Sequence, residues 1–128
     1  LSSIDPAEID NELLDLMCYE KRLLPHFHLS IQSGDNLILK RMKRRHNRED
    51  VIRICKKIKE LRKEVTFGAD LIVGFPTESE THFNNTLELV KTCSLSNVHI
   101  FPFSPKESTP ASKMPQVDEY KKKKESIN

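Results

Sequence analysis

Three polar segments of the sequence carry side chains suited to binding a small polar ligand. They are residues 32–34 (QSG), 74–78 (GFPTE) and 104–110 (SPKESTP), and each follows a mainly apolar stretch. Together they supply a carboxamide, hydroxyls, a carboxylate and an ammonium group. In parallel α/β folds, such groups gather at the carboxyl ends of the strands. We therefore expect the three segments to form one rim.

Strand and helix patterns alternate along the chain and would position this rim. Apolar or alternating stretches predict strands over 26–31, 65–73 and 98–103. Helical spacing of apolar residues predicts helices over about 6–18, 35–42, 47–61 and 79–93, and a last helix near Asp118. The alternation favours an α/β fold with parallel strands. About three strands with flanking helices form only part of a (βα) barrel, or else a small open sheet.

Details within these elements can be checked against the structure. Asp5 and Pro6 give a start signal for the first helix, and Asn47 gives one for the third. The apolar faces expected for the last two long helices contain Val51, Ile54, Cys55, Ile58 and Leu61, and then Phe83, Leu87 and Val90. Asp70 is the one charged residue inside the apolar run 65–73, so it needs a partner.

Composition excludes several classes of protein. The chain has 128 residues and a net charge of +2, which suits one soluble domain. No apolar run reaches 18 residues, so we expect no membrane span and a cytoplasmic protein. The three cysteines, Cys18, Cys55 and Cys93, are far apart in the sequence and odd in number. This spacing favours reduced, buried thiols over a disulfide framework or a metal site.

Positive charge is concentrated in residues 40–48, which hold six Lys and Arg and no acid. A second cluster, Lys121–Lys124, lies near the far end. Such a run is most often a solvated face, and if it faced RNA each phosphate contact would add salt-sensitive affinity. No aromatic residue for base stacking occurs within 40–48, which weakens the case for a self-sufficient RNA site.

Four motifs resemble one enzyme family. HLSIQSG at 28–34, LKRMKRRHNRED at 39–50, FGADLIVGFPTESE at 67–80 and FPFSPKESTPASKMPQV at 101–117 are similar to the second half of the radical S-adenosylmethionine core of tRNA methylthiotransferases. The resemblance covers residues 1–117, and 118–128 is expected to be a terminal helix or tail leading away from the core. The motifs are nearer to the MtaB type, which acts on threonylcarbamoyladenosine, than to the MiaB type, which acts on isopentenyladenosine.

The resemblance implies that a methylthio group is added to a modified adenosine next to the anticodon of tRNA. It also implies two 4Fe–4S clusters and S-adenosylmethionine as cofactors. The family's cysteine loop, C-x-x-x-C-x-x-C, is missing from this sequence. We therefore expect no catalytic residue and no metal ligand in the chain. On its own the chain is expected to be inactive, and it would need the first half of the barrel and the flanking domains as partners.

The resemblance also suggests roles for individual residues. The family's motif places Gln32 and Ser33 in the cofactor and substrate pocket. It places Asp70 and the turn Gly74-Phe75-Pro76 beside the cofactor's adenine, although a buried Asp70 held by backbone amides is an equal alternative. Arg44 is suited to pair with a carboxylate or a phosphate. The other residues expected to face substrate or RNA are Lys43, Arg45, Ser104 and Lys106.

Other interpretations stay open from the sequence alone. In the third polar segment Lys106 stands where the family has Arg, and Ser108 stands where it has Gly, which puts the shape of that loop in doubt. The chain is then also consistent with a catalytically dead remnant, an RNA-binding module or a different radical S-adenosylmethionine enzyme. A partial barrel would leave strand edges unpaired, so we expect the isolated chain to be marginally stable.

Overall fold

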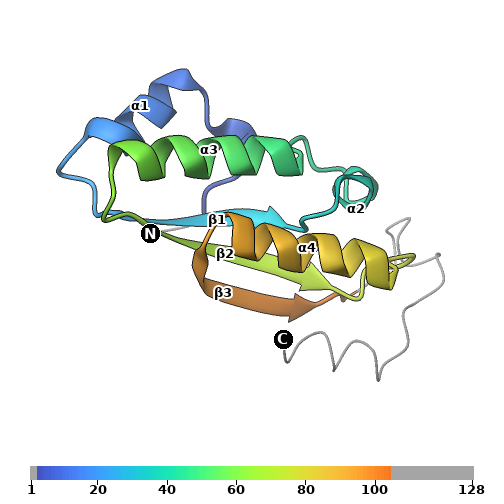
Figure 1. The fold of residues 1–128 in the computed structure, drawn as a ribbon. Coiled ribbons are helices and arrows are strands. Elements are labelled where there is room, and N and C mark those ends of the chain that lie inside the picture. Colours follow the sequence, from blue (N-terminus) through green and yellow to red (C-terminus); the bar gives the residue numbers. More distant parts are fainter. Residues whose placement is uncertain (1–2, 105–128) are drawn as a thin grey trace.

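The computed structural model describes residues 3–104 of the chain (Figure 1). The remaining part of the third polar segment, Lys106 and the helix expected near Asp118 lie outside the described residues. The elements, in chain order, are a 3₁₀-helix η1 (Pro6–Glu8), α1 (Asn11–Tyr19), β1 (His26–Gln32), α2 (Asn36–Arg41), α3 (Arg48–Leu61), β2 (Thr66–Val73), α4 (Glu80–Thr92) and β3 (Leu95–Pro102).

The three strands form one parallel sheet in the order β1-β2-β3. The connections through α3 and α4 pass over the same face of the sheet, and α1 lies beyond α3 on that side (Figure 1). Ile4 adds a single parallel bridge beside β1, because its amide donates to the His28 carbonyl at 2.8 Å and its carbonyl accepts from Ser30 at 2.9 Å. Sequential parallel strands with all helices on one side are the arrangement of a (βα) barrel. The α/β expectation is confirmed.

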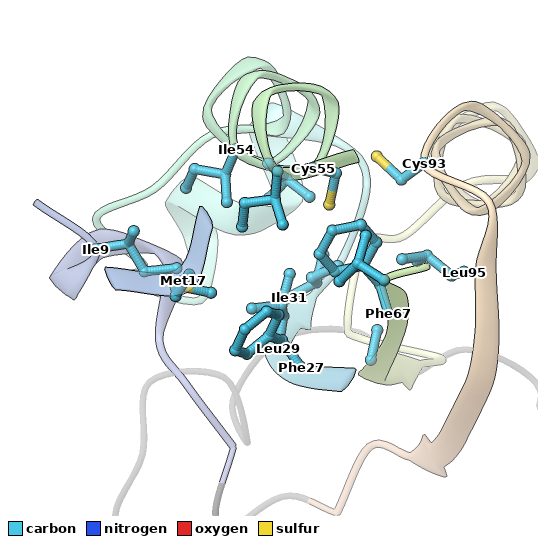
Figure 2. Packing of buried hydrophobic residues seen from close by; sticks show 14 of the residues in the cluster. Ile9, Met17, Phe27, Leu29, Ile31, Ile54, Cys55, Phe67, Cys93 and Leu95 are labelled. Carbon is cyan, nitrogen blue, oxygen red and sulfur yellow. The ribbon is translucent and has the colours of Figure 1, made fainter. Parts of the chain in front are cut away.

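The hydrophobic core lies between the sheet and the helices (Figure 2). Every second residue of β1 is buried, so Phe27, Leu29 and Ile31 point toward α3. The buried residues that meet them are Phe67, Ala69 and Leu71 from β2, Val51, Ile54, Cys55 and Ile58 from α3, and Leu14 and Met17 from α1. The stripe expected for α3 is confirmed except at Leu61, which is 46% exposed because the helix ends there.

The first predicted helix is wrong in one respect, since residues 6–18 form two helices. Asp5 caps the amide of Ala7 at 2.9 Å, but only the 3₁₀ turn follows it. Asp10 is extended and accepts a hydrogen bond from the amide of Leu13 at 2.8 Å, so it starts α1 as a second cap. A single helix across this junction would sacrifice the Asp10 cap and the burial of Ile9.

The predicted face of α4 also needs correction. Phe83 is buried as expected, but Thr86 and Leu89 complete the buried stripe, while Leu87 and Val90 are only partly buried. The helix is therefore rotated so that a threonine faces the interior. β3 begins at Leu95, three residues before the predicted start, because Ser94 adopts a left-handed φ of 52° and turns the chain directly from α4 into the strand.

All three cysteines are free and buried, as expected. The thiols of Cys55 and Cys93 hydrogen-bond between α3 and the end of α4 (Figure 2). This contact and burial raise the pKa of the Cys55 thiol. Within residues 3–104 no helix has the length and apolar character needed to cross a bilayer.

Replacing Leu29 by Ala should lower the free energy of unfolding by about 2–5 kcal/mol, because this fully buried side chain on β1 would leave a cavity. Urea denaturation followed by circular dichroism measures the change. Leu24→Ala is the control, since Leu24 is 70% exposed and its loss should change stability by less than about 0.5 kcal/mol. Equal losses for the two variants would contradict the burial pattern described here.

Candidate functional site

The first two polar segments lie at the carboxyl ends of β1 and β2, and of the third segment the described residues include only Ser104, just after β3. The Arg41 guanidinium donates to Thr77 Oγ1 at 2.6 Å and so joins α2 to the loop after β2. The Phe103 amide donates to the Val73 carbonyl at 2.8 Å, and the rings of Phe75 and Phe103 meet edge to face with centroids 5.1 Å apart. Residues 32–35, 74–78 and 103–104 therefore lie together at one end of the sheet, and we call this region the rim.

Left-handed backbone occurs repeatedly in the rim. Gln32 has a φ of 71°, Gly74 of 73° and Thr77 of 72°. Glycine adopts this conformation freely, whereas Gln32 and Thr77 each hold it at a cost of about 1–3 kcal/mol. The Gln32 side chain is half-buried, and none of the described residues hydrogen-bonds to its amide. The polar group of Gln32 is therefore available to a ligand.

Ser33 is fully buried and its hydroxyl is already engaged. Ser33 Oγ accepts from the Asp35 amide at 3.1 Å and lies 3.3 Å from Thr86 Oγ1. The neighbouring Gly34 amide donates to the same Thr86 oxygen at 2.8 Å. The Ser33 hydroxyl therefore holds the rim against α4, and a direct contact between Ser33 and a cofactor stays a prediction.

A second set of contacts fixes the same loop. Arg48, at the start of α3, donates to the carbonyls of Gly34 at 3.2 Å and Asn85 at 3.3 Å. Asn85 in turn donates to Asp35 Oδ2 at 2.7 Å. Sequence reasoning missed Asn85 and Thr86, because a polar residue in a helix carries no local sign of which loop it will meet.

Asp35 both accepts the hydrogen bond from Asn85 and caps a helix. Its Oδ1 accepts a hydrogen bond from the Ile38 amide at 3.1 Å, so Asp35 caps the N-terminus of α2. Burial opposes ionisation of Asp35, but the hydrogen bonds from Asn85 and Ile38 outweigh it and lower the pKa of the carboxyl below its usual value. Asp35 therefore remains an anion that organises the rim.

A hydrogen bond between two of its own residues stabilises the turn after β2. The buried carboxylate of Glu78 accepts from the Gly74 amide at 2.9 Å. Phe75 and Pro76 are buried, with Phe75 turned toward Phe103. Gly74, Phe75 and Pro76 are therefore buried in the turn, and their contact with an adenine stays a prediction.

Asp70 does not lie at the rim. It lies within β2, on the sheet face opposite the helices, where His28 Nε2 is 2.8 Å from its Oδ1 and the Ser3 hydroxyl donates to its Oδ2 at 2.9 Å. The alternative of a carboxylate held by backbone amides is wrong, because both partners are side chains. Partial burial opposes ionisation, yet the bonds from His28 and Ser3 and the nearby His99 lower the pKa of Asp70.

The basic segment 40–48 is only partly the solvated face that its composition suggests. Arg44 is half-buried, and its guanidinium donates to the Ser30 carbonyl at 3.0 Å and lies 3.3 Å from the Asp5 carboxylate. Together with Arg41 and Arg48, it holds the protein's own polar groups. The exposed cations that make no such contact are Lys40, Lys43 and Arg45. Lys43 adopts a left-handed φ of 61° where α2 ends.

His46 anchors the far end of this segment. Its ring is buried, with Nε2 3.0 Å from the Ile31 carbonyl, so the neutral tautomer donates there. Burial, aided by the charge of Arg44, lowers the pKa of His46 despite the bond to Ile31. Nδ1 is left without a hydrogen bond, 3.8 Å from Asp5. Ser104, by contrast, is exposed just after β3.

A helix-covered parallel sheet with a polar rim is the architecture of the Radical SAM superfamily, whose family model matches residues 2–90. The chain belongs to this superfamily. Coproporphyrinogen III oxidase from Escherichia coli, described as a radical SAM enzyme, shares the fold with a TM-score of 0.75 over 98% of this chain and 29% of that chain, at 18% identity.

Relatives with higher identity support the predicted resemblance to tRNA methylthiotransferases. The chain is similar to the threonylcarbamoyladenosine tRNA methylthiotransferases MtaB of Rickettsia prowazekii, at 58% identity over 91% of this chain, and of Aquifex aeolicus, at 47% over 96%. It is 40% identical over 89% of its length to the tRNA-2-methylthio-N(6)-dimethylallyladenosine synthase of Orientia tsutsugamushi. The chain spans 28%, 30% and 25% of these three relatives.

Replacing Gly34 by Ala should lower the free energy of unfolding by about 1–3 kcal/mol, because an added Cβ would lie 2.6 Å from the Thr86 Cα and force α4 away from the rim. Chemical denaturation measures the loss. Lys40→Ala, at a nearby exposed position, should leave stability nearly unchanged. A Gly34→Ala protein as stable as the parent would show that the loop does not press on α4.

Stability should fall as the pH drops below about 6.5, because the unfolded state then binds a proton at His46 that the folded state, with its lowered pKa, does not. Above that pH both states carry neutral His46 and the effect vanishes. Unfolding free energies at pH 7.5 and 5.5 measure the slope. His46→Gln should flatten it and His99→Gln should not; an unchanged slope in His46→Gln would contradict the assignment.

Proposed function

We propose that this chain is part of a cytoplasmic tRNA methylthiotransferase that adds a methylthio group to threonylcarbamoyladenosine beside the anticodon. The observation that carries the proposal is the 58% identity over 117 residues with a relative named for that substrate. Two further relatives with that name are 47% and 41% identical, whereas those named for dimethylallyladenosine are 40% and 38% identical. The order of identities favours the threonylcarbamoyl substrate.

The residues present do not fit an iron–sulfur cluster. Cluster ligation needs several thiolates gathered at one place. Here Cys55 and Cys93 are buried with Phe67 and Ile54 on the helix-covered side of the sheet, and Cys18 belongs to α1. We therefore assign the cluster ligands of the proposed enzyme to parts of the protein beyond this chain and route no step through the cluster.

The rim does fit S-adenosylmethionine. This cofactor has an amino acid, a ribose and an adenine, and each of them needs hydrogen-bonding partners. When bound, it supplies a methyl group and, on reduction, a deoxyadenosyl radical. Gln32 offers an uncommitted carboxamide and Ser104 offers an exposed hydroxyl. These two residues would hold and orient the cofactor. The buried left-handed turn at Gly74 would shape the rim beside it, while Ser33 and Asp35 keep the loop in place.

Exposed positive charge beside the rim supports a tRNA substrate. Lys40, Lys43 and Arg45 lie on and just after α2, which packs at the carboxyl end of β1 (Figure 1). Cations there would contact tRNA phosphates and position the nucleotide over the rim without reading its sequence. Arg44 is less suited to this role, because its guanidinium is occupied by Asp5 and Ser30.

The proposal is tested by disrupting the gene that encodes this chain and analysing tRNA nucleosides by mass spectrometry. We expect 2-methylthio-threonylcarbamoyladenosine to disappear and its unmodified precursor to accumulate, with 2-methylthio-dimethylallyladenosine unchanged. Loss of the dimethylallyl product instead would reassign the substrate. No change in either nucleoside would overturn the proposal and favour a catalytically dead remnant.

Complementation with a Gln32→Gly gene tests the rim within the same experiment. Glycine accepts the left-handed backbone without strain, so folding should be preserved while the carboxamide is lost. We expect reduced methylthiolation at normal protein levels. Asn84→Ala, at an exposed position on α4, is the matched control and should restore full modification. Full restoration by Gln32→Gly would exclude Gln32 from cofactor binding.

A further inference from the structure

The uncovered face of the sheet carries a cluster of three metal-ligating side chains, one from each strand. His28 Nε2 is 2.8 Å from Asp70 Oδ1, and His99 Nδ1 is 3.6 Å from the same oxygen. The three candidate ligand atoms all lie within 4.8 Å of one another. The imidazole rings of His28 and His99 have their centroids 5.0 Å apart and are tilted by 46° to each other.

The register of the sheet produces this convergence. Asp70 on β2 lies directly opposite His99 on β3, whereas the position opposite His28 is Gly68. A Cβ at Gly68 would lie 2.5 Å from His28 Nδ1, so only glycine leaves room for the ring to lie over β2 and reach Asp70. The cluster therefore depends on a specific small residue in the middle strand as well as on the three polar ones.

The surroundings favour a cation as the ligand. A cavity of about 550 Å³ opens onto the cluster, and among residues 3–104 no Lys or Arg lines it; its described lining is Ser3, Leu24, His26, His28, Asp70, Asn97, His99 and Phe101. With neutral imidazoles, this lining carries the single negative charge of Asp70. The Ser3 hydroxyl bonds the second oxygen of Asp70 and orients the carboxylate, as outer partners of metal ligands do.

We propose that His28, Asp70 and His99 bind a single divalent transition-metal ion, with Zn²⁺ as the representative case. Two imidazoles and one carboxylate form the donor set of three-ligand zinc sites and of non-haem iron sites. Bonds of about 2.0–2.2 Å from one ion require only small movements of these side chains. The remaining coordination position faces the cavity, where water or a polar ligand would complete the shell.

The test is metal titration of the full 128-residue chain, prepared without a histidine tag and stripped with a chelator. Isothermal titration with Zn²⁺ should give one ion per chain. Titration with Co²⁺ should give visible d–d absorption without the intense ultraviolet band of cysteine thiolate ligation. Asp70→Asn and His99→Gln should each weaken Zn²⁺ binding by at least about tenfold. Circular dichroism confirms that each variant is folded. We expect His99→Gln to fold normally, because the His99 side chain is about half exposed on an edge strand.

His26→Gln is the matched control, since His26 lies on the same face but hydrogen-bonds to Thr66 and lies outside the cluster. Its affinity should equal that of the parent chain. Absence of Zn²⁺ binding in the parent, equal binding in Asp70→Asn and His99→Gln, or equal loss in His26→Gln would each overturn the proposal. The measurement uses neither tRNA nor S-adenosylmethionine, so its outcome is independent of the proposed methylthiotransferase function.

Discussion

The alternation of apolar and polar side chains along β1, which separates the helix-covered face of the sheet from the uncovered one, is the constraint on which this structure depends. Helices cover only one face, so every apolar residue of β1 must alternate with a polar one, and Phe27, Leu29 and Ile31 occupy the covered positions. The same alternation places His26, His28 and Asp70 together on the other face. A shift of one residue in the register of β1 would bury the imidazoles against α3 and expose the core.

Local sequence signals predicted most of the architecture. Strand and helix patterns, the Asn47 cap and the order of the rim segments all act over a few residues, so they can be seen without the fold. The split of the first helix was missed because Asp10 lies between apolar residues at helical spacing. Its role as a helix cap was therefore not recognised. The face of α4 was misjudged because Thr86 is buried for its hydrogen bonds rather than for its hydrophobicity.

The candidate site was less predictable, because its polar groups are shared between segments far apart in the sequence. Ser33 and Arg44 looked available for ligands, but Thr86 and Asp5 already engage them. The grouping of His28, Asp70 and His99 required the register of three strands and the absence of a side chain at Gly68. Gln32 is the opposite case, since none of the described residues hydrogen-bonds to its side-chain amide, and its role in binding stays a prediction.

The contact between Gly34 and Thr86 has a consequence for the dynamics of the molecule. The Gly34 backbone lies against the Thr86 backbone, and Arg48 donates hydrogen bonds to the carbonyls of both Gly34 and Asn85. The loop 32–35 therefore has little freedom to move unless α4 moves with it. Amide protons in the loop and in the central turns of α4 should then exchange with solvent as one cooperative unit. A molecule that binds at the rim would slow exchange along a helix that it never touches.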